Sequence, residues 1–121
     1  DAVYIKEIMM AIHQALEGAM RTDDYEGYLK LLHADYEFVR HQTGVTVSLD
    51  EWKPVVQGMF EAKKAGNLNW ETSRCLYENE DILVMHNVMG FPDGSKEAVM
   101  VVHTLKDGKI LKTETGATPI E

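Results

Sequence analysis

The sequence predicts an α+β domain, a cone-like roll in which three N-terminal helices pack on a curved, mainly antiparallel β-sheet. Apolar residues recur at three- and four-residue steps in three segments before residue 66, which is the spacing of amphipathic helices. After residue 68, alternating segments are separated by short loops rich in Asn, Asp and Gly, which is typical of β-hairpins. Helices that precede a meander in this way pack together on one face of its sheet.

The first two helices are predicted over residues 2–21 and from Asp23 to about Ala34. In the second helix, Asp23 is expected to be the N-cap, with Glu26 as its reciprocal partner. Each helix carries one apolar stripe, which is expected to face the sheet. The stripes comprise Ile5, Ile8, Met9, Ile12, Leu16 and Met20 in the first helix, and Tyr25, Tyr28, Leu29 and Leu32 in the second.

A strand is predicted over residues 35–41, because the side chains there alternate between two faces. Tyr36, Phe38 and Arg40 share one face of this strand. Residues 45–47 are predicted to return beside it as a short second strand.

The third helix is predicted over residues 49–65, because Ser48 and Glu51 have the spacing of a capping box. Pro54 has no backbone N–H to donate, so the helix is expected to start late or to bend there. Gly66 supplies the stop.

Four further strands are predicted at residues 69–78, 81–91, 96–105 and 109–116. Residues 106–108 are expected to form a three-residue hairpin loop, which pairs His103 with Leu111 and Val101 with Thr113. The inner face of the sheet then carries Val99, Val101, His103, Leu105, Leu111, Thr113 and Thr115. The outer face carries Met100, Val102, Thr104, Ile110, Lys112 and Glu114.

A strict two-residue turn is the alternative, and it would place Lys112 and Glu114 beside His103. The three-residue loop is preferred because it buries no unneeded charge.

Charge and surface character limit the partners of the protein. Acidic residues number 20 against 12 basic ones, for a net charge of −8, which opposes binding to nucleic acid or to an anionic membrane. No apolar run approaches the roughly 18 residues of a membrane span. An outer sheet face with Met100, Val102 and Ile110 is unusually apolar, so we expect a homodimer through that face.

Length and cysteine content indicate one domain, residues 1–121, in a reducing compartment. The single cysteine, Cys75, excludes an internal disulfide, and the cytoplasm is the simplest location. No dinucleotide or phosphate-binding motif occurs, so no cofactor is expected. A metal site is disfavoured because the histidines lack a ligand spacing, although His86, His103 and Cys75 remain an alternative set across strands.

Two segments resemble a known superfamily. DDYEGYLKLLHADYEFV is similar to the helix-to-strand passage, and AVMVVHTLKDGKILKTETG to the last hairpin, of nuclear-transport-factor-2-like (cystatin-like) proteins, in the SnoaL-like branch with polyketide cyclases and ketosteroid isomerases. The resemblance implies a pocket for a small, partly apolar organic ligand. It also implies three catalytic positions of the isomerases, which here hold Leu16, Arg40 and Val101 and so lack the required side chains. Ketosteroid isomerisation is therefore not expected.

Three residues are candidates for proton-transfer chemistry beside a carbonyl group, such as isomerisation, cyclisation or dehydration. His103, on the inner face, is either a general base or a hydrogen-bonded core residue. His86 shares that face if the 92–95 loop is a two-residue hairpin, and faces outward if it is bulged. Arg40 either clamps a ligand anion or forms a surface ion pair. The rival is a non-catalytic binding or assembly module of the same fold.

The ligand-lining residues are expected on the inner face and on the helix that covers it. Aromatic residues in such patterns are mainly core, and threonine hydroxyls also suit a strand, so each has a structural reading as well. The candidates are Tyr36, Phe38, Trp52, Met59, Val101, Thr113 and Thr115.

Overall fold

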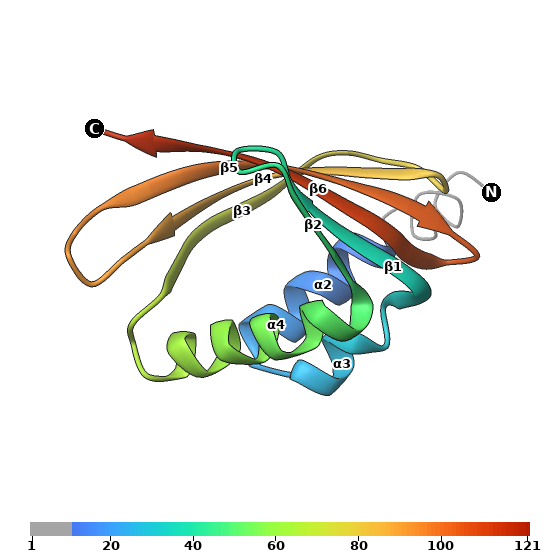
Figure 1. Ribbon diagram of the computed structural model, residues 1–121, viewed down its shortest axis with the longest axis horizontal. Helices are drawn as coiled ribbons and strands as arrows, with labels where there is room; N and C mark the ends of the chain where they lie inside the picture. The colour runs from blue at the N-terminus through green and yellow to red at the C-terminus, as the bar shows by residue number, and fades with distance from the viewer. Residues whose placement is uncertain (1–10) are drawn as a thin grey trace.

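The computed structural model describes residues 11–121, with three helices on one side of a six-stranded sheet (Figure 1). In chain order the elements are α2 (Ala11–Arg21), α3 (Tyr25–Leu29), β1 (Leu32–Arg40), β2 (Val45–Ser48), α4 (Leu49–Lys64), β3 (Asn69–Glu78), β4 (Ile82–Gly90), β5 (Lys96–Lys106) and β6 (Lys109–Ile120). The predicted α+β class and the grouping of the helices are confirmed. The part of the first predicted helix before residue 11 lies outside the described residues.

The sheet is mixed but mostly antiparallel. Its strand order is β2-β1-β6-β5-β4-β3, and only β1 and β6 run parallel. β1 therefore joins the C-terminal meander through its last strand, so the two halves of the chain share one sheet. No helix among residues 11–121 is long and apolar enough to cross a membrane.

The second helix differs from the prediction at both ends. Its N-cap is Asp24, whose carboxylate accepts the N–H of Gly27 at 2.9 Å, and not Asp23. Asp23 instead forms an ion pair with Lys63 at 2.6 Å. The helix ends at Leu29 rather than near Ala34, because the following residues pair with β6 as the start of β1.

The third helix has the predicted capping box, in which Ser48 and Glu51 each accept a backbone N–H of the other. The helix starts at Leu49, so Pro54 does not delay it. It ends at Lys64, and Gly66 supplies the predicted stop, since the N–H groups of Gly66 and Asn67 donate to carbonyls of the last turn at 3.1 and 2.8 Å.

The hairpin between β5 and β6 corrects the predicted pairing. The turn has two residues, Asp107 and Gly108, both at positive φ, and Lys106 pairs with Lys109. A bulge then falls between the Leu105–Ile110 pair and the pair of Thr104 with Lys112, which leaves Leu111 unpaired. Ile110 is consequently fully buried in the core, whereas Leu111 is only half-buried.

Beyond the bulge, the side chains of β6 lie on the faces that the sequence predicted, whereas Ile110, which was predicted on the outer face, lies on the inner one. His103 pairs with Thr113, and Val101 with Thr115, so each predicted pairing is displaced by two residues. A shift of two residues preserves the face of every side chain, whereas a shift of one would reverse it. Val101, His103, Thr113 and Thr115 therefore lie on one face.

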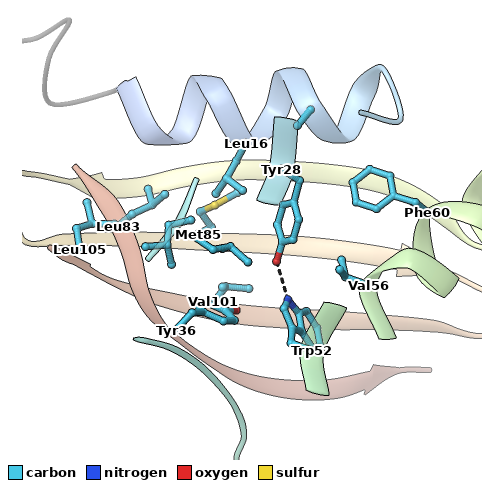
Figure 2. Packing of buried hydrophobic residues seen from close by; sticks show 13 residues of the cluster. Leu16, Tyr28, Tyr36, Trp52, Val56, Phe60, Leu83, Met85, Val101 and Leu105 are labelled. Carbon is cyan, nitrogen blue, oxygen red and sulfur yellow. Dashed lines mark hydrogen bonds between the residues drawn. The ribbon is translucent and has the colours of Figure 1, made fainter. Parts of the chain in front are cut away.

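The core fills the space between this inner face and the helices (Figure 2). Leu16 of α2, Tyr28 of α3 and Val56 of α4 meet the sheet side chains Met85 and Val101 there. Ile110, Leu83 and Tyr36 are the most deeply buried large side chains. The burial of apolar area on a single face explains why the helices cover only one side of the sheet.

Candidate functional site

The candidate site lies on the inner face, where His103 is held by the paired strands β5 and β6. Its side chain is 8% exposed, and its Nδ1 lies 2.8 Å from Oγ1 of Thr113, its cross-strand partner. Burial lowers the pKa of His103 from its ordinary value of 6.5 to about 4. The imidazole is therefore neutral at physiological pH.

Two buried tyrosines stand near this pair. The Tyr28 hydroxyl accepts a hydrogen bond of 2.8 Å from Nε1 of Trp52 (Figure 2), and burial raises the pKa of Tyr28 to about 12. Burial also raises the pKa of Tyr36 strongly, while the neighbouring Thr113 hydroxyl lowers it. Among the described residues, the Tyr36 hydroxyl has no partner in hydrogen-bonding geometry, so Thr113 is a close neighbour rather than a bonded one. Thr113 thus borders both His103 and Tyr36.

An aromatic stack lies beside Thr113, which pairs with Phe38 across β1 and β6. Phe38 of β1 and Trp52 of α4 stack with ring centroids 3.9 Å apart and an angle of 10° between their planes. Met59 of α4 packs partly buried against the same core. The expected lining residues on β1 and α4 therefore lie in the core or against it, and their role in binding a ligand stays a prediction. They are Tyr36, Phe38, Trp52 and Met59.

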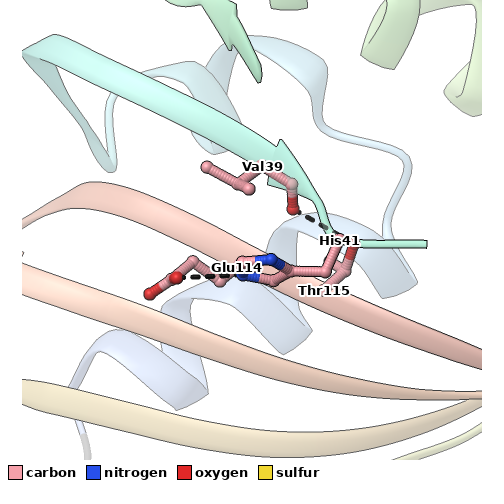
Figure 3. A network of polar contacts seen from close by, with 4 residues as sticks. All are labelled: Val39, His41, Glu114 and Thr115. Atoms are coloured by element: carbon pink, nitrogen blue, oxygen red, sulfur yellow. Dashed lines mark hydrogen bonds and ion pairs between the residues drawn. The ribbon is translucent and has the colours of Figure 1, made fainter. Parts of the chain in front are cut away.

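Arg40 lies at the end of β1 on the inner face, because it pairs with Thr115 of β6. It is exposed, and it forms no ion pair with any residue of the described chain. The Thr115 hydroxyl donates to the carbonyl of Val39 at 3.3 Å, so it is already engaged (Figure 3).

His86 does not join His103. The N–H of Phe91 donates to the carbonyl of Ser95, which leaves a loop of three residues, 92–94, between them. The bulged alternative therefore applies. His86 then pairs with Met100 on the outer face, whereas Leu83, Met85 and Asn87 alternate onto the inner face. No cluster of His, Cys, Asp or Glu suited to a metal occurs within residues 11–121.

Two features of the structure were not anticipated. On the outer side, Nε2 of His41 lies 3.0 Å from Oε1 of Glu114, which ties the end of β1 to β6 (Figure 3). On the inner face, Asn87 is 5% exposed, and its Oδ1 has no partner among the described residues. The pairing of β4 with β5 depends on the conformation of the 92–95 loop. Had that conformation been known, the alternation of side chains along β4 would have placed Asn87 on the inner face.

The hollows of the structure do not coincide with the predicted pocket. An open groove of about 520 Å³ lies against residues 34–37 and 46–50, and of the expected lining residues only Tyr36 touches it. A slot of about 10 Å³ lies between the helices and the start of β3. Its lining comprises Met20, Val56, Met59, Phe60, Lys63, Leu68 and Trp70. An enclosed pocket at His103 stays a prediction.

Comparison with protein families identifies the class. A SnoaL-like domain model matches residues 12–113, which is most of the chain, and the protein belongs to this family. None of the curated proteins matches the sequence significantly.

Solved structures share the fold at low sequence identity. An NTF2-like protein of unknown function from Burkholderia xenovorans is 12% identical with a TM-score of 0.70, over 97% of this chain and 88% of that chain. A putative ketosteroid isomerase from Kribbella flavida is 10% identical with a TM-score of 0.69, over 95% and 81%. An NTF2-like protein of unknown function from Cytophaga hutchinsonii is 11% identical with a TM-score of 0.68, over 88% and 87%. Identities this low show the fold alone, and together with the match to the SnoaL-like family they confirm the predicted superfamily.

Proposed function

We propose that this SnoaL-like protein binds a small, partly apolar carbonyl compound against its inner face and moves a proton next to the carbonyl group. His103 is the base, and Tyr36 is the hydrogen-bond donor to the carbonyl oxygen. The observation that carries the proposal is that a buried histidine and an unbonded buried hydroxyl border the same threonine, Thr113.

The proton transfer needs one particular tautomer of His103. If Nδ1 carries the proton and donates to Thr113, then Nε2 presents a free lone pair. Nε2 then takes a proton from the carbon beside the carbonyl. The C–H electron pair becomes the enolate, whose charge collects on oxygen, and the imidazolium returns the proton to a carbon of the same molecule.

The environment of the two groups suits these roles. Burial keeps His103 neutral, so the base form is always present at neutral pH. Burial also keeps the Tyr36 hydroxyl protonated, so it remains a donor to a developing oxyanion. A base of low pKa gives little driving force, and a carbon acid activated by two carbonyl groups is therefore the substrate type that fits best.

Arg40 completes the proposal at the open end of β1. Its exposed guanidinium, without an acidic partner in the described structure, is suited to an anionic group of the ligand.

The test is deuterium exchange of 2,4-pentanedione in D₂O, followed by NMR with and without the protein. We expect the protein to accelerate exchange at the central carbon, and His103→Gln to abolish the acceleration. His86→Gln is the matched control, because His86 lies on the outer face. Equal rates for the protein and buffer, or full activity of His103→Gln, would contradict the proposal.

A second proposal concerns assembly, and it stands whether or not the protein is catalytic. The outer face carries Val84, Val88 and Val102 half-buried, and Met100 is 43% exposed. We infer a homodimer through this face, because an apolar sheet back is normally covered. Native mass spectrometry should report a dimer, which Val102→Lys should reduce to a monomer.

The low cysteine content also favours a cytoplasmic location.

A further inference from the structure

Asn87 is a buried amide in an apolar setting. It lies mid-strand in β4 on the inner face, where Met85 and Met89 flank it along the strand. Its neighbours across the sheet are Val99 on β5 and Ser73 on β3. Asn87 is only 5% exposed, and its Oδ1 has no hydrogen-bond partner within residues 11–121.

An unpaired amide in such a place opposes folding. Oδ1 gives up its hydrogen bonds to water on burial and gains none in return. The inner-face residues on either side of Asn87 are methionines, and an apolar side chain of similar size would fill the position without that loss. A residue that weakens the fold where a better one is available points to a role in binding.

A bound water is a poor explanation for this amide. Buried waters typically make about three hydrogen bonds, and they occupy polar sites. Of the neighbours along and across the strands, Met85, Met89 and Val99 offer no strong donor or acceptor side chain. The Ser73 hydroxyl is the one polar side-chain group among them, which is fewer than the partners that a buried water normally has. A ligand that is itself apolar, with one donor group, matches these surroundings better.

The narrow slot beneath α4 lies on the same part of the sheet. Met89, the next inner-face residue after Asn87, pairs with Trp70, which lines the slot. Met20 and Met59 line its opposite side. Methionine side chains are unbranched and adapt readily, so this slot is the part of the interior best able to widen around a ligand.

We propose that Asn87 recognises a hydroxyl or N–H group on a small apolar ligand that enters between α4 and the β3–β4 edge. This inference rests on the proposed function, since it concerns a ligand on the same inner face, and it adds a donor group to the ligand. Asn87 is a binding residue here and takes no part in moving the proton.

The test compares two probes of nearly equal shape, 2-naphthol and 2-methoxynaphthalene, of which only the first has a donor. Binding is measured by isothermal titration calorimetry. We expect the protein to bind 2-naphthol about tenfold more tightly, the effect of one well-placed hydrogen bond, and Asn87→Leu to bind both probes equally. Met85→Leu, on the same strand and face, is the matched control and should keep the preference.

Each outcome decides the proposal. A preference that persists in Asn87→Leu, or no preference in the unaltered protein, overturns the role of Asn87 while leaving the inner-face pocket in place. Failure of the unaltered protein to bind either probe overturns the role of Asn87, and the proposed function is then decided separately by the exchange of 2,4-pentanedione. Thermal melts of Asn87→Leu and of a second variant, Asn87→Ala, show whether each is folded. A melting temperature of Asn87→Leu at or above that of the unaltered protein, together with lost preference, supports the proposal.

Discussion

The imidazole Nδ1 of His103 and the Oγ1 of Thr113 lie 2.8 Å apart, on residues that pair directly across β5 and β6. The backbone ladder fixes both Cα atoms, so the side-chain contact follows from strand register. The bulge at Leu111 is what brings Thr113, rather than Lys112, opposite the histidine. A single extra residue in β6 therefore determines which side chain His103 contacts on the inner face.

Thr113→Val should destabilise the protein by about 1–3 kcal/mol, the usual result of leaving a buried polar group without its partner. Valine has the shape of threonine, so the loss reports on the hydrogen bond of His103. The measurement is urea unfolding followed by circular dichroism. Thr115→Val is the control, because its hydroxyl bonds only a backbone carbonyl at 3.3 Å and is half-buried. Equal losses of unfolding free energy in the two variants would show that the contact with His103 contributes no more to stability than the bond of Thr115.

Stability should fall with acid in a range set by His103. Burial lowers the pKa of His103 from 6.5 to about 4, so between these values the unfolded chain binds a proton that the folded protein does not. The stability is complete above pH 6.5 and falls as the pH drops toward 4, by up to about 3 kcal/mol.

His103→Gln isolates this contribution, because the variant keeps every other titrating group, including Glu78, whose pKa is raised by burial and whose effect has the opposite sign. Unfolding free energies of both proteins are measured from pH 7.5 to pH 4. The difference between the two proteins should change across this range. A constant difference would mean that His103 titrates normally in the folded state.

The fold and the inner face could be predicted from the sequence, whereas the details of pairing could not. Alternation identifies faces, and faces survive an error of two residues in the register of β6. Ile110 takes the buried place that was predicted for Leu111 because of a bulge, and neither residue type indicates a bulge. Asp24 and Asp23 are equally good N-caps by type, and tertiary contact with Lys63 decides between them.

The site was less predictable than the fold for a related reason. The outward facing of His86 depends on loop length after β4, which the sequence left open. The isolation of the Tyr36 hydroxyl depends on distances between elements far apart in the chain. Alternation supplies the direction of a side chain but not its partners.

Trp52→Phe should destabilise the protein by roughly 1–3 kcal/mol, because the Tyr28 hydroxyl loses the indole donor in a buried position. Phenylalanine keeps an aromatic ring beside Phe38, so most of the stacking is retained. Urea unfolding measures the loss. Trp70→Phe serves as the comparison, since Trp70 is only half-buried and forms no hydrogen bond through its indole in the described structure. A smaller loss for Trp52→Phe than for Trp70→Phe would contradict the assigned role of the bond.

Two glycine-to-alanine changes should have opposite signs. Gly108 sits at φ 74 in the β5–β6 turn, where alanine is strained, so Gly108→Ala should destabilise the protein by about 1 kcal/mol. Gly18 lies in α2, and a Cβ placed there meets no atom within 4 Å, so Gly18→Ala should stabilise by about 0.5–1 kcal/mol through its helix propensity. Thermal melts measured side by side give both signs in one experiment. A loss of stability in Gly18→Ala would indicate that α2 approaches a neighbour there more closely than the structure has it, and a neutral Gly108→Ala would place the turn in another conformation.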